Sequence, residues 1–382
     1  MSGFLNRRRV LAGGAAALGA AMLGPAVPAG AAAAAAPLGA GKGVPEETRT
    51  LEELYRDAKA QGGKLVVYSG GDRAIGAEAT RAAFRAAFPD IALTLVVDYS
   101  KFHDVRVDYQ LATGTLVPDV VQLQTLQNFP RWAEQDRLLR YKPAGFSKIY
   151  DAFKDPGGAW MAAFVVGFSY MYDAATAGSA APRSPLDLVD PQWKGRVASS
   201  YPHDDDAVLY LYKRYVETYG WSWLDRLVAQ DPQFARGSFT PAAAVSARQK
   251  VIGIGGSGSL IAPATTPATW AVADGHPFMA WGQRMAIFKD AKNTAAAKLY
   301  TNWTLSVERQ LTAANGWSVR TDVKHPGGLE PVWRYPNANV DGFPRFMADR
   351  AEAERWRQQF AIYFGEVQGE PTPGRLGLHP GR

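Results

Sequence analysis

The chain has 382 residues, of which 47% are hydrophobic and 20% are charged. This length suffices for two domains with cores of ordinary size, and the composition excludes a disordered or collagen-like protein. The absence of cysteine excludes a disulfide scaffold, a zinc–thiolate site, an iron–sulfur cluster and a cysteine nucleophile, and it leaves the redox compartment open. The formal net charge of +6 becomes about +3 without the arginines at 7–9, because Lys+Arg then falls from 42 to 39 against 36 acidic residues. Since the sequence has no long basic run, we expect no binding to nucleic acid.

The first 36 residues have the pattern of an export segment. The arginines at 7–9 precede a Gly/Ala-rich apolar stretch over 12–27, and the sequence AGA at 29–31 offers small residues for a cleavage site. This segment resembles a twin-arginine (Tat) secretion signal, so we expect residues 1–36 to be the signal peptide with its Ala-rich cleavage region. An uncleaved N-terminal anchor is the alternative. We therefore predict an exported protein, periplasmic or extracellular at the cell surface, with the Tat export machinery as a partner.

From Thr50 onward, strands and helices alternate. Thr50 and Glu53 predict a capping box for a helix over 51–61, which Gly62 and Gly63 end. We then expect strands over 64–68, 91–97 and 119–123, a turn over 69–72, and helices over 75–88 and 103–112. Later segments are an apolar run over 161–172, strands over 196–200 and 250–254, and helices over 207–218, 223–229, 293–306, 307–314 and 348–363. Such alternation predicts an α/β protein with parallel βαβ units.

Four short motifs carry a resemblance to a known family. They are KLVVYSG at 64–70, PDVV at 118–121, PQWKGRV at 191–197, and AKN at 291–293 leading into AAKLY at 296–300. In order and spacing they resemble the extracellular solute-binding proteins of ABC importers, of the cluster that includes the ferric-ion-binding proteins. The resemblance covers about residues 50–335.

The resemblance implies a type II periplasmic-binding fold, with two α/β lobes, a ligand cleft and two crossover segments. Lobe one would comprise 50–165 plus 278–345, lobe two 166–277, and a C-terminal helix and tail 346–382, with crossovers near 165–172 and 277–282. It further implies a monomeric, non-enzymatic protein without a cofactor, which binds a small-molecule solute and meets an importer permease at the membrane.

The candidate ligand-binding residues lie where predicted strands end. In open α/β sheets, ligands bind beyond the carboxyl ends of the strands, where helix N-termini present amide N–H groups. Three such places are 69–72, 199–201 and 255–259, although a tight glycine turn or a serine helix cap would explain the same residue types. The candidates are Tyr68, Ser69, Gly70, Asp72, Gln124, Ser199, Ser200, Tyr201, Gly256 and Ser257.

The solute is predicted less directly. Ferric members of the family typically use a histidine or acid after the first strand, a glutamate after the Asp-Val pair and a tyrosine pair after the strand at 250–254. This sequence has Asp72, then Gln122 and Gln124, then Gly256 and Ser257 in those places. Hard Fe(III) needs phenolate and carboxylate oxygens, so direct iron binding is disfavoured unless Tyr68, Tyr170 or Tyr201 supplies them. Serine and glycine turns instead favour a small oxyanion or a chelated metal.

Other interpretations remain open at this point. The sequence HDDD at 203–206 could bind a cation, or its acids could stabilise a helix N-terminus. A secreted hydrolase needs a nucleophile and a base, yet the five histidines stand in no catalytic motif. The match to G-x-G-x-x-G at 253–258 is followed by Pro263 and Pro267, which disfavours the helix of a nucleotide site. A ligand receptor for a sensor has the same fold as a receptor for an importer.

Overall fold

The computed structural model describes residues 43–263, 265–312, 316–324, 327–371, 374 and 377–382. The export segment predicted over residues 1–36 lies outside these ranges, so the Tat motif and the cleavage site stay predictions. Within the ranges, no helix is both long and apolar enough to cross a bilayer.

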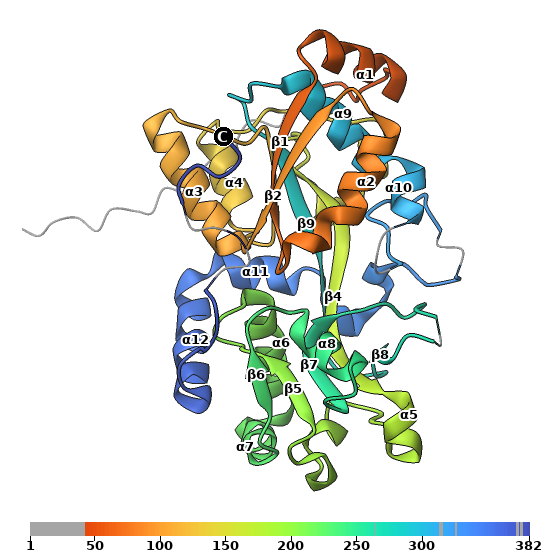
Figure 1. The fold of residues 1–382 in the computed structure, drawn as a ribbon, viewed down its shortest axis with the longest axis vertical. Helices are drawn as coiled ribbons and strands as arrows, with labels where there is room; N and C mark the ends of the chain where they lie inside the picture. The colour runs from red at the N-terminus through yellow and green to blue at the C-terminus, as the bar shows by residue number, and fades with distance from the viewer. Residues whose placement is uncertain (1–42, 264, 313–315, 325–326, 372–373, 375–376) are drawn as a thin grey trace, which may run out of the picture. The chain divides into compact units, whose positions relative to one another are not determined.

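The strands form one hydrogen-bonded path in the order β2-β1-β3-β9-β4-β7-β5-β6, with β8 paired to β4 (Figure 1). Their bounds are β1 Lys64–Gly70, β2 Ala92–Asp98, β3 Val120–Leu123, β4 Met161–Asp173, β5 Val197–Ser200, β6 Gln233–Ala235, β7 Ile252–Ser257, β8 Ala268–Ala271 and β9 Met279–Ile287. Strands β6, β8 and β9 are not among the strands predicted from the sequence. Two of these are only three or four residues long, and β9 falls where a crossover segment was expected.

The sheet is mixed rather than parallel. The predicted parallel pairing holds for β1 with β2 and β3, and for β5 with β7; β6 also pairs parallel with β5. Strands β4 and β9 run antiparallel to each other and to their other neighbours. The long strand β4 pairs with β9 between Met161 and Phe168, and with β7 from Phe168 to Tyr172. Consequently β4 and β9 join the two ends of the strand path.

The helices are α1 Leu51–Ala60, α2 Glu78–Ala87, α3 Ser100–Thr113, α4 Asn128–Glu134, α5 Ala174–Ala177, α6 Asp206–Tyr219, α7 Trp221–Ala229, α8 Thr240–Ser246, α9 Thr294–Leu305, α10 Val307–Leu311, α11 Gly342–Ala348 and α12 Arg350–Phe364. The predicted capping box of Thr50 and Glu53 is present at α1. The helix expected over 75–88 begins as a 3-10 turn, and Ile75 is 67% exposed. Between residues 75 and 88, the buried side chains are those of Phe84 and Phe88.

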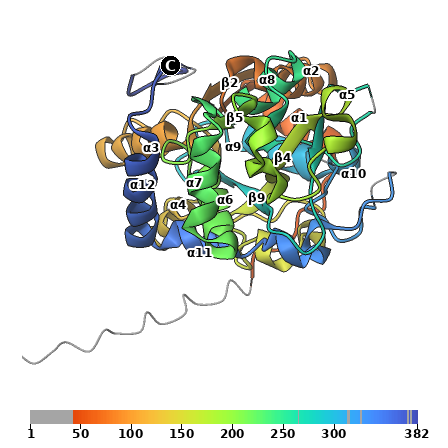
Figure 2. The same cartoon turned by 90° about the horizontal axis from the view of Figure 1, so that it is seen from below.

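Two main hydrophobic clusters lie along the strand path. One surrounds β1 and β2 and includes Phe84, Tyr300 and Trp303. The other surrounds β5 and β7 and includes Tyr212 and Trp223. Helices α11 and α12 add Phe343 and Phe360 to this second cluster, and α12 lies beside α6 in both views (Figures 1 and 2).

The C-terminal tail returns to the other end of the strand path. The Tyr68 hydroxyl donates to the Pro380 carbonyl over 2.7 Å, and Gln110 Nε2 donates to the Leu378 carbonyl over 2.6 Å. Arg106 Nε donates to the Gly377 carbonyl over 2.7 Å. The segment after α12 therefore contacts β1 and α3, whereas α12 itself packs on α6.

Candidate functional site

A cavity of about 150 Å³ lies beside β4 and β9, the paired strands in the middle of the strand path. Its floor is formed by alternate residues of these two strands, because successive side chains of a strand point to opposite faces. Phe164, Val166 and Phe168 come from β4, and Trp281 and Gln283 come from β9. The register places Val166 opposite Trp281 and Phe164 opposite Gln283. The cavity floor is therefore fixed by the pairing of β4 with β9.

The floor consists mainly of aromatic side chains and contains one side-chain amide, that of Gln283. The rings of Phe168 and Trp281 lie 5.1 Å apart at an interplanar angle of 75°. Trp281 Nε1 donates to Gln283 Oε1 over 3.0 Å, which fixes the orientation of that amide and turns its Nε2 away from the indole. Gln283 is 5% exposed.

One side of the rim follows the carboxyl ends of three neighbouring strands. Strand β1 ends at Gly70 and is followed by Asp72. Strand β2 is followed by Ser100 and Lys101, and β3 is followed by Gln124. Ser100 Oγ accepts from the Gln124 backbone N–H over 2.9 Å. A Cβ at Gly70 would collide with Ser100 Oγ, so a larger residue there would displace this hydroxyl from the Gln124 amide. This side has the geometry that open α/β sheets use for ligand binding.

The opposite side of the rim comes from the loop before α6, the segment after β6 and the end of β7. It supplies Asp204, Asp205 and Asp206, then Ser238, then Ser257. Asp205 caps α6, since its Oδ1 accepts from the Ala207 and Val208 amides over 2.8 and 3.0 Å. The helix-cap interpretation of the HDDD sequence is confirmed at this residue, and the same carboxylate also lines the cavity.

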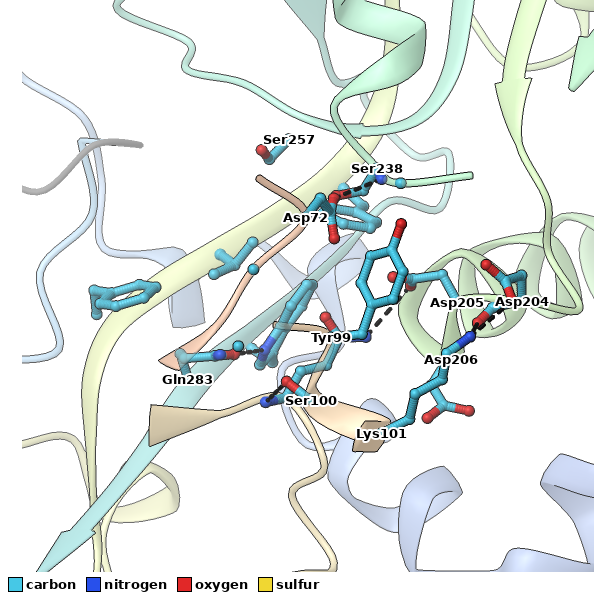
Figure 3. A pocket seen from close by; sticks show the side chains of 18 residues that line it. Asp72, Tyr99, Ser100, Lys101, Asp204, Asp205, Asp206, Ser238, Ser257 and Gln283 are labelled. Atoms are coloured by element: carbon cyan, nitrogen blue, oxygen red, sulfur yellow. Dashed lines mark hydrogen bonds and ion pairs between the residues drawn. The ribbon is translucent and has the colours of Figure 1, made fainter. Parts of the chain in front are cut away.

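Three contacts join the two sides of the rim (Figure 3). Asp72 Oδ2 accepts from the Ser238 backbone N–H over 2.6 Å and from the Ser238 hydroxyl. Lys101 Nζ lies 2.7 Å from Asp204 Oδ1. Gln124 Nε2 donates to Asp205 Oδ1 over 3.3 Å. The cavity is thus closed by groups that lie 81 to 166 positions apart in the sequence.

The lining is rich in acidic side chains. It contains the ammonium group of Lys101 and four carboxylates, those of Asp72, Asp204, Asp205 and Asp206. Asp204 is paired with Lys101 and with Arg236, whose NH1 lies 2.8 Å away, and Asp206 is paired with Arg357. Among the described residues, Asp72 and Asp205 form no ion pair.

The protonation of these two unpaired acids follows from their surroundings. Burial raises the pKa of Asp72. Burial, followed by the negative charge of Asp72, raises the pKa of Asp205 to about 7. The cavity therefore holds two carboxyl groups that resist ionising together.

The lining does not favour direct iron coordination. In the part of the chain that the structure describes, no group of three or more His, Asp or Glu side chains is placed to hold a metal ion. Tyr99 lines the cavity, but burial and the nearby carboxylates raise its pKa, which disfavours the phenolate that Fe(III) needs. Tyr68, Tyr170 and Tyr201 are buried away from the lining.

Four of the predicted ligand-binding residues line the cavity: Gly70, Asp72, Gln124 and Ser257. Six do not: Tyr68, Ser69, Ser199, Ser200, Tyr201 and Gly256. Tyr68 is bound to the C-terminal tail, and Ser69 is buried within β1 beside Gln122.

The other four residues are engaged within the protein. Strand β5 ends at Ser200, as predicted, whereas β7 runs three residues beyond its predicted end at 254. Ser199 and Ser200 lie within β5, where Ser199 Oγ contacts the Tyr212 hydroxyl over 2.6 Å and Ser200 Oγ donates to the Gly237 carbonyl. Tyr201 stacks on Phe234. Gly256 lies within β7, paired with Ser169, and its carbonyl accepts from Trp270 Nε1.

Several lining residues were missed by sequence reasoning. Tyr99, Ser100 and Lys101 follow a predicted strand, so the same rule that selected Asp72 could have found them. Ser238, Trp281 and Gln283 depend on β6 and β9, which the sequence did not reveal. Phe164, Val166 and Phe168 alternate within the predicted apolar run, but only the register shows that this face borders a cavity.

Comparison with known proteins places the chain in a family. Residues 117–326, more than half of the sequence, match the family described as bacterial extracellular solute-binding protein. The chain belongs to this family. Proteins of this family deliver solutes to ABC importers, so the chain is a solute-binding protein, and the resemblance seen in the sequence is confirmed. Members of this family are binding proteins. A search of curated proteins gave no significant match.

Solved structures share the fold of this solute-binding protein. The substrate-binding protein of an ABC transporter from Agrobacterium tumefaciens matches with a TM-score of 0.64 and 18% identity, covering 80% of this chain and 95% of the other. AfuA from Actinobacillus pleuropneumoniae, with fructose-6-phosphate bound, matches with a TM-score of 0.62 and 19% identity, covering 79% of this chain and 98% of the other. Iron-bound HitA from Pseudomonas aeruginosa matches with a TM-score of 0.60 and 16% identity, covering 78% of this chain and 99% of the other. The predicted type II periplasmic-binding fold is confirmed by these matches.

Proposed function

We propose that this protein captures a small solute in the cavity between β4, β9 and the rim loops, closes over it, and delivers it to the permease of an ABC importer. The observation that carries the proposal is the cavity itself, which is closed by contacts of Asp72, Lys101 and Gln124 with the opposite side of the rim. The fold-level likeness to proteins that hold iron or fructose-6-phosphate supports the same role.

Closure would occur about β4 and β9. We assign 50–165 plus 278–341 to lobe one and 166–277 to lobe two, and we place α11 and α12 with lobe two because they pack on α6. The boundary at 345 from the sequence analysis moves to the start of α11 for this reason. Hinge closure around a ligand is a common motion of two-lobed proteins, in which a few residues of the connecting segments absorb the backbone change.

Export through the Tat route is part of the proposal. The paired arginines and the Ala-rich cleavage region over 1–36 support delivery to the periplasm or the cell surface, where a monomer would meet its permease. A receptor that reports its solute to a sensor is the second function compatible with the same cavity.

The role is tested by filling the cavity. Val166→Trp places a large ring on the floor between Phe164 and Phe168, whereas Val307→Trp changes an exposed position at the start of α10. The full-length proteins are unfolded thermally against ferric citrate, phosphonates, phosphate esters, sulfonates, amines and sugars. Ligand at about 100 times Kd adds roughly 2.7 kcal/mol, which moves Tm by several degrees.

We expect one compound class to raise Tm in the parent and in Val307→Trp but not in Val166→Trp. A shift that survives Val166→Trp would place the solute elsewhere. If no compound shifts Tm and native mass spectrometry finds no small molecule retained, the solute-binding role of this cavity is contradicted.

A further inference from the structure

We infer that the solute is a small organic cation, an amine or quaternary ammonium compound, whose charged group lies between Asp72 and Asp205 and whose carbon skeleton lies on the aromatic floor. This inference rests on the proposed function and specifies the chemical class of the solute. It departs from the small oxyanion or chelated metal that the sequence favoured.

The balance of charge in the lining gives the first argument. Asp204 and Asp206 are neutralised by Lys101, Arg236 and Arg357. Asp72 and Asp205 have only neutral donors around them in the described chain: the amide and hydroxyl of Ser238 for one, and backbone amides with Gln124 for the other. Two carboxylates facing one cavity without a counter-ion are unfavourable, and a cation between them removes that cost.

The helix-start amides, the Ser238 amide and the lysine of the lining are already bound by carboxylates. The exposed amides at the start of α6 are bound by Asp205 Oδ1, and the Ser238 amide is bound by Asp72 Oδ2. The lining lysine is held by Asp204. An anion would therefore have to displace protein carboxylates from their own hydrogen bonds and then lie beside them.

The floor fits the rest of such a solute. Phe164, Phe168, Trp281 and Tyr99 present four aromatic rings to the cavity. Aromatic faces attract ammonium groups, most strongly where water is excluded. A cavity of about 150 Å³ is comparable to one that holds a benzene-sized molecule, so the solute has only a handful of heavy atoms.

Gln283 gives an independent sign that a ligand completes the site. Its side chain is 5% exposed and lines the cavity, and its Oε1 is bound by Trp281. No acceptor among the described residues bonds to its Nε2. This amide group lines the cavity and can donate to a ligand, so we expect the solute to offer an oxygen there, as an amino alcohol does.

The inference is tested with cations and their matched neutral isosteres. The full-length chain is unfolded thermally at pH 8 with choline, ethanolamine, putrescine and agmatine, with 3,3-dimethylbutan-1-ol as the uncharged isostere of choline, and with inorganic phosphate and fructose-6-phosphate. The variants are Asp205→Asn, in which asparagine retains the helix cap but not the charge, and Asp349→Asn, the same exchange at the cap of α12 outside the lining.

We expect at least one cation to raise Tm by several degrees, with no shift from its neutral isostere or from the anions. Its affinity should fall at least tenfold in Asp205→Asn and change less than twofold in Asp349→Asn. The inference is overturned if no cation shifts Tm, or if an anion or a neutral isostere shifts it as much. Anion binding that Val166→Trp abolishes would leave the proposed function intact, whereas the absence of any bound or retained solute would remove both.

Discussion

The four carboxylates of the cleft form two pairs with different surroundings. Asp204 and Asp206 are neutralised by cationic side chains, whereas Asp72 and Asp205 accept hydrogen bonds only from neutral groups in the described structure. The first pair holds structural elements together, since Asp204 joins α3 to the loop before α6 and Asp206 joins α6 to α12. The second pair leaves negative charge directed at the cavity. Acidic residues that are adjacent in sequence can therefore serve different purposes, and the presence of a counter-ion separates them.

The largest expected effect comes from removing a neutralised carboxylate. Asp204→Ala leaves Lys101 and Arg236 without their shared partner, and the Asp204 side chain is only 12% exposed. We expect the free energy of unfolding to fall by about 2–3 kcal/mol, measured by urea denaturation. The exposed pair of Asp136 and Lys289 provides the control. Asp136→Asn keeps a residue type that tolerates the positive φ of 55° there, and it should cost less than about 1 kcal/mol. Equal losses in the two variants would show that Asp204 has no special structural role.

Removing the charge of an unpaired carboxylate should instead increase the stability of the folded chain. The pKa of Asp205 is about 7 in the folded chain against an ordinary value near 3.8, so the folded state binds more protons between those values. The stability of the ligand-free protein that is due to this residue therefore declines as the pH rises from about 4 to 7. Asp205→Asn should be more stable than the parent at pH 8 by at least about 1 kcal/mol, the equivalent of one pKa unit, and should differ little at pH 4. A variant that is less stable at pH 8 would contradict the unpaired state of this acid.

Solute affinity should rise with pH, whereas the stability of the ligand-free protein falls. A cation binds the ionised carboxylate, so affinity should rise about tenfold between pH 6 and pH 8 as Asp205 loses its proton. Asp72, Asp206 and Tyr99 are titratable groups that interact with Asp205, and Lys101 and Asp204 line the same cavity. Calorimetric titration of the best cation in the parent and in Asp205→Asn measures the effect, which should be largely absent in the variant. Affinity that falls with rising pH would favour an anion.

The smallest expected effect is a change in solute affinity on removing Lys101, and its direction distinguishes a cationic solute from an anionic one. Lys101→Met removes the ammonium from the lining and leaves Asp204 paired with Arg236. We expect cation affinity to increase two- to threefold, because like charge is removed from the rim. If Lys101 instead binds an anionic solute, the same substitution should weaken binding at least tenfold.

The sequence predicted the side of the rim that follows β1 and β3 better than the floor. Gly70, Asp72 and Gln124 were found because they follow short β-branched strands, and the carboxyl ends of such strands meet at one edge of a sheet. The prediction failed for Gly256, where β7 continues through Gly255 at φ of 80° and a register shift, so a glycine run that suggested a loop is a bulge inside a strand.

The floor could not be predicted from local pattern. Phe164, Val166 and Phe168 look like ordinary core residues, and they border a cavity only because β4 pairs antiparallel with β9 across more than a hundred positions. The same limit applies to the choice of solute. Serine and glycine turns suggested free amide donors for an oxyanion, and only the structure shows that Asp72 and Asp205 occupy those donors.

The most direct test of the cation site is a pair of calorimetric titrations of the full-length protein at pH 8. One titration uses the cation with the largest Tm shift, and the other uses its neutral isostere, in which carbon replaces the charged nitrogen. Our account predicts saturable binding of the cation and at least tenfold weaker binding of the isostere, because Asp72 and Asp205 supply the difference. Equal or tighter binding of the neutral isostere would show that these carboxylates do not recognise charge, and it would contradict the account.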